Sequence, residues 1–282
     1  MPPTFNNYGT FTKASGTGTA AYASATITNG GNFNYNSGGL AIGANFTQTA
    51  GNANLGTNFT VGSNVRVEAG SFTGRGAITG YFYNNGSVSP GNQLGLITAA
   101  SFTNTAAATL NIQLGAVGAP GTNYDRVALT GGNSLNGTLN VTLLNGFVPS
   151  PGNQFTVMVH TARSGVFAFT NSSRYDFTIL YTSSNVVRRA ENAKPAIVFN
   201  SGLIQMVCRP FQIAATGNDV DGAVTNLQFY LNGGLLGSFT NAAQINPYTA
   251  KMKVSYDFPG LSTLAVQATD ERGAVTTTNV NV

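Results

Sequence analysis

Apolar and polar residues alternate in short runs along the chain. In residues 110–114, 139–143 and 155–159, every second side chain is apolar. Each run predicts a β-strand that buries one face, because successive side chains of a strand point to opposite sides. No stretch carries the helical apolar period of about 3.6 residues over a useful length, so we expect almost no helix.

Turns rich in Asn and Gly separate these runs, and some of them repeat. Asn-x-Gly-x-aromatic occurs at residues 7–11 and 29–33, and Phe-Thr recurs at a constant interval at Phe46, Phe59 and Phe72. Asn and Gly tolerate the left-handed backbone of tight turns, and stacked Asn side chains can form amide ladders. This pattern favours a β-solenoid, whose stacked coils share one core. An antiparallel sandwich of the same composition is the alternative.

Charge divides the chain into two parts. Residues 1–187 hold nine charged residues, six basic and three acidic, and residues 188–282 hold the other thirteen. The step falls at a short polar stretch that ends at Pro195, and we interpret residues 188–194 as a linker. We therefore predict a β-helix repeat domain over residues 1–187. Residues 195–282 have the size of one small β-sandwich.

Composition excludes several classes of protein. Only 8% of the residues are charged, against about 25% in an average soluble protein, and 42% are hydrophobic. A disordered chain needs the reverse balance, and a coiled coil needs abundant Glu, Lys, Leu and Arg. One Cys cannot pair within the chain, which excludes a disulfide scaffold. So little charge is typical of extracellular bacterial repeat proteins.

Partners and location follow from the same composition. The net charge of +4 is spread along the chain, so we expect no nucleic-acid partner, which would need a clustered basic patch. No run of about 18 apolar residues occurs, so we expect no membrane span. The first residues lack the basic region and apolar core of a signal peptide. We interpret the chain as a mature or trimmed piece of a longer precursor.

Four motifs of the first part follow one another in a recognisable order. They are N-G-S-V-S-P-G-N at 85–92, A-T-L-N-I-Q-L-G at 108–115, Y-D-R-V-A-L-T-G at 124–131 and L-N-G-T-L-N-V at 135–141. This order resembles the passenger-type repeat region of bacterial autotransporters and related anchored surface proteins, over residues 5–187 in character and 84–160 in motif. The resemblance implies a right-handed parallel β-helix, secretion and a role at the cell surface. A translocator barrel or sorting tail is not recognisable, which departs from that family.

The second part carries its own motifs. They are N-D-V-D-G-A-V-T at 218–225, L-Q-F-Y-L-N-G at 227–233, L-G at 236–237 and A-V-Q-A-T-D-E-R-G-A at 265–274. Residues 195–282 thus resemble a bacterial immunoglobulin-like domain of the kind appended to cell-surface proteins and secreted glycosidases. The predicted fold is therefore all-β, a right-handed parallel β-helix (solenoid) followed by an Ig-like β-sandwich.

Candidate nucleophiles and bases are scarce. His160 is the only His and continues an alternating strand, in which we expect it to point outward. A triad would also need a carboxylate to orient it. Cys208 is expected to be a small core residue rather than a reactive thiol. We therefore predict neither catalytic nor cofactor-binding residues, and a protein that is not an enzyme.

Carboxylates are equally scarce in the first part. Polysaccharide-degrading enzymes built on β-helices need paired carboxyl groups or a cation site. The first part offers Glu68, Asp125 and Asp176, which lie far apart in sequence. Arg126 follows Asp125 directly and is expected to neutralise it. A β-helix polysaccharide-degrading enzyme remains an alternative only if distant coils bring these acids together.

One acidic stretch in the second part is a weak candidate for a cation site. Asp219, Asp221 and Asp270, with Asn218 and Glu271, offer the oxygen ligands that Ca²⁺ prefers. Six or more oxygens are needed, however. We favour the alternative that Asp219 and Asp221 cap turns, with Gly222 in the left-handed conformation. The expected cofactor set is therefore empty.

Four tyrosines are candidates for a carbohydrate-binding surface. Tyr22, Tyr35, Tyr81 and Tyr83 would stack on sugars if they were exposed. Aromatic ladders between coils are the alternative, because cross-strand aromatic pairs stabilise sheets.

These observations favour a non-enzymatic structural protein outside a bacterial cell. Unpaired strand edges at the two ends of such a protein would recruit further copies, so we expect head-to-tail self-association into a filament or stalk. Few charges mean little repulsion between copies. An adhesin that binds surface glycans is the alternative.

Overall fold

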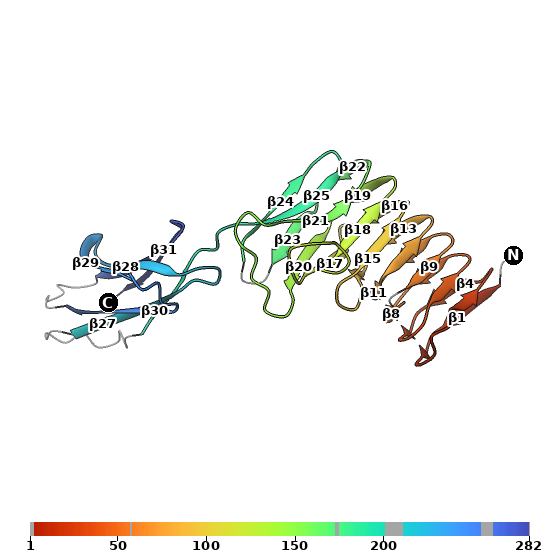
Figure 1. Ribbon diagram of the computed structural model, residues 1–282, viewed down its shortest axis with the longest axis horizontal. Coiled ribbons are helices and arrows are strands. Elements are labelled where there is room, and N and C mark those ends of the chain that lie inside the picture. The colour runs from red at the N-terminus through yellow and green to blue at the C-terminus, as the bar shows by residue number, and fades with distance from the viewer. Residues whose placement is uncertain (1–2, 57, 173–174, 201–210, 255–261, 282) are drawn as a thin grey trace. The chain divides into compact units, whose positions relative to one another are not determined.

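The computed structural model describes residues 3–56, 58–172, 175–200, 211–254 and 262–281. Within these residues every regular element is a β-strand, and the 32 strands form five sheets (Figure 1). The predicted all-β fold is confirmed, with parallel sheets first and antiparallel sheets after them. Two compact units are distinguished: Met1–Ser173 with Phe177–Ala190, and Arg174–Asp176 with Glu191–Val282.

Three sheets build the first unit, and the chain visits them in rotation. Sheet A contains β1 (Thr4–Asn7), β4 (Thr26–Asn29), β7 (Phe46–Gln48), β10 (Val65–Val67), β13 (Tyr81–Asn84), β16 (Ser101–Asn104), β19 (Gly132–Leu135) and β22 (Ala162–Gly165). Sheet B contains β2 (Thr10–Lys13), β5 (Asn32–Tyr35), β8 (Asn52–Asn54), β11 (Ser71–Gly74), β14 (Ser87–Pro90), β17 (Thr109–Leu114), β20 (Thr138–Leu143) and β23 (Phe169–Ser172). Sheet C contains β3 (Ala20–Tyr22), β6 (Leu40–Ile42), β9 (Phe59–Val61), β12 (Gly76–Ile78), β15 (Leu96–Ala99), β18 (Arg126–Leu129), β21 (Gln154–Val159), β25 (Asn185–Ala190) and β24 (Phe177–Tyr181).

Coil length changes along this parallel β-helix. Val65 pairs with Phe82 one coil later, whereas Phe102 pairs with Asn133. The second of these coils is therefore almost twice as long as the first. The longer coils carry larger loops, and one of these loops borders the groove described below.

A continuous hydrophobic core fills the interior, and aromatic rings contact one another along it as far as Phe102. The repeated Phe46, Phe59 and Phe72 are all fully buried and lie on sheets A, C and B respectively. Phe72 and Phe82 have ring centroids 5.3 Å apart, and Phe82 and Phe102 have the same separation. Such pairs add about 0.5–1.5 kcal/mol each beyond their buried area, so the core ties each coil to the next.

An amide ladder runs along one corner of the interior. The Asn7 side chain donates a hydrogen bond to the Asn29 Oδ1 atom at 2.6 Å, and Asn29 donates to the Gln48 Oε1 atom at 2.8 Å. Val67 interrupts the row of amides, and beyond it Asn84 donates to Asn104 at 2.7 Å. The predicted stacking of Asn side chains between coils is therefore present, and these buried amides satisfy one another.

Glycine is required where neighbouring turns touch. Gly51 has a φ of +67°, and a Cβ atom there would lie 2.2 Å from the carbonyl oxygen of Gly31 in the preceding coil. Only Gly accepts both the left-handed backbone and this approach. Such glycine turns therefore set how closely successive coils stack.

An antiparallel hairpin ends sheet C. β25 pairs antiparallel with β21 on one side and with β24 on the other. The hairpin buries Arg188, whose guanidinium carbon lies 5.5 Å from the centre of the Phe177 ring. Burial lowers the pKa of Arg188, and the aromatic ring offers a weak compensation for the lost hydration.

The second unit is a pair of antiparallel sheets, as the Ig-like prediction requires. One contains β26 (Ala196–Phe199), β27 (Phe211–Asn218) and β30 (Tyr248–Val254). The other contains β29 (Gly234–Thr240), β28 (Val224–Leu231), β31 (Thr263–Asp270) and β32 (Val275–Asn281). Their facing sides bury a separate core that includes Ile213, Leu227, Phe229 and Val266.

Candidate functional site

The three carboxylates of residues 1–187 are not brought together as a catalytic pair. Glu68 accepts a hydrogen bond from the Arg66 Nε atom at 2.6 Å on the outside of sheet A. Asp125 is buried, and Asp176 belongs to the second compact unit. Glycosidases need two carboxyl groups that act on one bond, typically about 5–9.5 Å apart. Each acid here has its own structural surroundings.

Asp125 joins two backbone segments of the β-helix through hydrogen bonds. Its Oδ1 atom accepts the Gly95 N–H at 2.7 Å, and its Oδ2 atom accepts the Gln113 N–H at 2.8 Å. The side chain is fully buried, and burial raises the pKa of Asp125 to about 8 despite the two backbone hydrogen bonds, which lower it. A lone acid between two apolar strands was the only sequence signal for this role.

The expected neutralisation of Asp125 by Arg126 is wrong. The Arg126 Nε atom donates to the Thr156 carbonyl oxygen at 2.8 Å, and its Nη2 atom donates to the Tyr124 hydroxyl at 2.9 Å. Asp125 directly precedes β18 and its buried carboxylate is bound to the Gly95 and Gln113 N–H groups, whereas Arg126 begins the strand and is only partly buried.

The expected outward position of His160 is also wrong, because only 4% of this residue is exposed. A β-bulge between Thr156 and Met158 shifts the pairing with β25 and reverses the alternation. Burial lowers the pKa of His160, and the positive charge of Arg163 lowers it further. Cys208 lies outside the described residues.

The four tyrosines do not form one exposed platform. Tyr35 is fully buried, and Tyr22 is half-buried against the core. Tyr83 is half-buried, and the Arg66 guanidinium lies 4.4 Å from the centre of its ring. Tyr81 is exposed. Sugar stacking on all four side chains, the first of the two interpretations, is therefore wrong.

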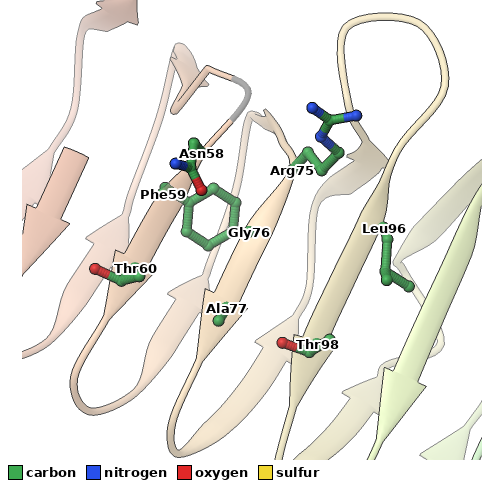
Figure 2. A pocket seen from close by; sticks show the side chains of 8 residues that line it. All are labelled: Asn58, Phe59, Thr60, Arg75, Gly76, Ala77, Leu96 and Thr98. Atoms are coloured by element: carbon green, nitrogen blue, oxygen red, sulfur yellow. The ribbon is translucent and has the colours of Figure 1, made fainter. Parts of the chain in front are cut away.

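The outer face of sheet C is hollowed beside Arg75. The hollow has a volume of about 650 Å³ and spans β9, β12 and β15. Figure 2 shows Asn58, Arg75 and Leu96 at the same end of these three strands. Small side chains form the adjoining row, namely Thr60, Ala77 and Thr98.

A second hollow adjoins the first at Arg75. It has a volume of about 460 Å³ and lies between residues 91–94 and the loop that contains Gly121 and Thr122. Asp125 helps to position this wall, because it accepts the N–H of Gly95 directly after the first segment. We call the two hollows together the Arg75 groove. No sequence signal predicted it, because its residues come from three separate coils.

The weak cation candidates come together at one end of the sandwich. Asp270 uses both carboxylate oxygens: Oδ1 accepts the N–H groups of Arg272 and Ala274, each at 2.8 Å, and Oδ2 accepts the Asn192 amide at 2.8 Å. Asp219 Oδ1 accepts the Asp221 N–H at 3.4 Å. The bonds from the Asp221, Arg272 and Ala274 N–H groups are local turn-capping bonds of the kind that the alternative interpretation expects, whereas the Asn192 bond joins segments 78 residues apart.

Two features reduce the negative charge among Asp219, Asp221, Asp270 and Glu271: the raised pKa of Asp219 and the guanidinium group of Arg272. Burial raises the pKa of Asp219 to about 7, with further contributions from the hydrogen bond and the charge of Asp221. The Arg272 Nη1 atom lies 2.7 Å from Glu271 Oε1 and 3.9 Å from Asp221 Oδ2. One buried oxygen on each of Asp219 and Asp221 has no hydrogen-bond partner among the described residues. Among all the residues that the structure describes, no group of three or more His, Cys, Asp or Glu side chains has the arrangement of a metal site.

The expectation that Gly222 adopts the left-handed conformation is wrong. Its backbone is not among those with a positive φ. The Glu271 carboxylate packs closely against Gly222, so a Cβ atom at this position would displace the end of the Glu271 side chain.

Comparisons with known proteins leave the family open. No protein-family model matches the sequence, and no curated protein matches it. A structure of Clostridium thermocellum CbhA fibronectin(III)-like modules is 22% identical and covers 30% of this chain and 92% of its own, with a TM-score of 0.24. A Bacteroides uniformis β-glucuronidase is 8% identical, with a TM-score of 0.23, and the match covers 67% of this chain but 28% of that enzyme. Both TM-scores are low, so neither likeness bears on the function of this chain. No helix in the described part of the chain is long and apolar enough to cross a membrane.

Proposed function

We propose that this chain is a non-enzymatic structural module outside a bacterial cell, a β-helix stalk that carries an Ig-like module. The observation that supports this best is the separation of Glu68, Asp125 and Asp176, each of which has its own surroundings. The polar side chains of the interior serve to join coils, as the amide ladder does. A polysaccharide-degrading enzyme would need two of the acids on one bond.

The β-helix suits the role of a stiff spacer. Each coil contacts only its neighbours, and eight strands stack in sheet A. At about 4.8 Å per strand, the distance from the first strand to the last is about 34 Å. The continuous hydrophobic core opposes bending at any one coil.

Self-association through the end of the β-helix is the finer part of this proposal. β22 and β23 are the last described strands of sheets A and B, so each has one unpaired edge within the described residues. Phe169 in β23 is exposed to 69%. Unpaired edges and exposed apolar side chains recruit other strands. Head-to-tail addition between unlike surfaces would then give open filaments.

Light scattering and negative-stain microscopy of the whole chain test this proposal. We expect the molar mass to rise with concentration, and Phe169→Lys to abolish the rise by adding charge at the edge. Val275→Lys, an equivalent substitution of an exposed apolar residue in the second unit, serves as the matched control. A monomer at every concentration, without filaments, would refute self-association.

A further inference from the structure

Two rows of residues form the outer face of sheet C at the Arg75 groove. Thr60 pairs with Ala77, Ala77 with Thr98, and Thr98 with Ala128, so one row consists of small side chains. Arg75, Leu96 and Arg126 form the adjoining row. Leu96 pairs with Arg126, and Arg75 stands opposite Leu96 because the next residues, Gly76 and Ile97, pair with each other. The face is therefore flat along one row and bears two guanidinium groups along the other.

Positive charge dominates this face. The two carboxylates of residues 3–172 are held elsewhere: Glu68 binds Arg66 on sheet A, and Asp125 turns into the wall, where it accepts backbone hydrogen bonds. Arg75 is exposed and borders both hollows. Arg126 is held in place by its bonds to Thr156 and Tyr124. The groove therefore favours an anionic ligand.

The remaining lining suits sugar hydroxyl groups. Asn58, Thr60 and Thr98 line the first hollow, and Asn92, Gln93 and Thr122 line the second. Amides and hydroxyls both donate and accept hydrogen bonds, as a sugar ring requires. Leu96 supplies an apolar contact between them.

We propose that the Arg75 groove binds an acidic oligosaccharide that lies along the axis of the β-helix, with a uronate carboxylate on Arg75. A guanidinium group holds a carboxylate through two parallel hydrogen bonds. Arg75 and Arg126 lie in the same row, two strands apart, which is about 9.6 Å at the usual strand spacing. A second carboxylate of the same glycan therefore reaches the neighbourhood of Arg126. This binding goes beyond the structural role and does not depend on self-association.

A nucleic acid fits the groove less well than an acidic glycan. Single-stranded nucleic acids bind through basic grooves lined with exposed aromatic side chains on which the bases stack. Among the described residues that line the groove, the one aromatic is Phe59, whose side chain is fully buried. Hydroxyl and amide groups on a flat face match sugars instead.

Titration calorimetry on the whole chain tests the proposal with a hexamer of galacturonate as the probe. Cellohexaose is the neutral sugar and inorganic phosphate the anion without a sugar. We expect binding of the acidic hexamer alone, weakened by salt. Arg75→Gln should lower the affinity at least about tenfold, because a hydrogen bond to a charged group is lost. Lys251→Gln, which removes the same charge from an exposed position in the second unit, should leave the affinity unchanged.

Several outcomes would overturn the proposal. Equal binding of cellohexaose would show that charge is not recognised, and equal binding of phosphate would show a simple anion site. Equal losses for Arg75→Gln and Lys251→Gln would place binding outside the groove. Absence of binding to galacturonate, glucuronate and mannuronate hexamers at millimolar concentration would also refute it. Circular dichroism and the melting temperature check that each variant is folded.

Discussion

Replacing Asp125 by Asn is expected to remove a pH dependence of stability from the β-helix. The native carboxyl group has a pKa of about 8, whereas the usual value is 3.8. Between these values the folded protein holds a proton that the unfolded chain releases. The folded state therefore gains stability from this group below pH 4, and the gain is lost as the pH rises towards 8.

The magnitude follows from the shift. Within that window, the free energy of unfolding falls by about 1.4 kcal/mol per pH unit. From pH 5 to pH 7 the loss is therefore about 3 kcal/mol. The amide of the Asp125→Asn variant does not titrate, but its nitrogen cannot accept the N–H of Gly95 or Gln113. At pH 5 the variant should consequently be less stable by about 1–3 kcal/mol, and this difference should shrink or reverse by pH 7.

Urea unfolding at pH 5, 6 and 7 measures the effect. The chain has no Trp, so far-ultraviolet circular dichroism follows the transition. Asp219, with a pKa of about 7, also titrates in this range, but it is present in both proteins, and its contribution cancels in the difference. Hydrogen exchange at the Gly95 and Gln113 amides gives a local readout of the same bonds. Parallel pH profiles for the two proteins would show that Asp125 is ionised at pH 5, contrary to the argument.

Further predictions concern the coils and the acidic cluster. Asn29→Leu should cost about 2–4 kcal/mol in urea unfolding, because it leaves the partner amides of the ladder unsatisfied. Gly51→Ala should lower the melting temperature by several degrees, since its Cβ atom would meet the Gly31 carbonyl at a positive φ; an unchanged value would mean that the turn can move. EDTA should shift the melting temperature by less than about 2 °C, because Arg272 already supplies positive charge to the acids. A larger shift that Ca²⁺ reverses would show a metal site.

Local periodicity explains the part of the fold that could be predicted from the sequence. The runs at 110–114, 139–143 and 155–159 became β17, β20 and β21. A strand with one buried face has an apolar side chain at every second residue, and this alternation can be recognised from the sequence alone. The regular spacing of Phe46, Phe59 and Phe72 is not the coil repeat, because these residues lie on three different sheets and Phe46 pairs with Val65 in the next coil.

Departures from this alternation could not be predicted from the sequence. The strand that ends before His160 contains a bulge, and one extra residue reverses which side chains are buried. Nothing in the alternating sequence indicates where such a shift occurs. The surroundings of His160 therefore depended on the pairing of β21 with β25, a strand that follows it in sequence.

The chemistry of this β-helix is determined by which residues the coils bring side by side. Asp125 meets Gly95 and Gln113, which lie 30 and 12 residues away in sequence. The Arg75 groove likewise depends on coil length, because a longer coil contributes Gly121 and Thr122 as its far wall. Motif spacing along the chain cannot show such neighbours when one coil is almost twice as long as another. In a solenoid of unequal coils, each pair of neighbours depends on the lengths of the intervening loops, so a binding surface can arise where no single repeat carries its signature.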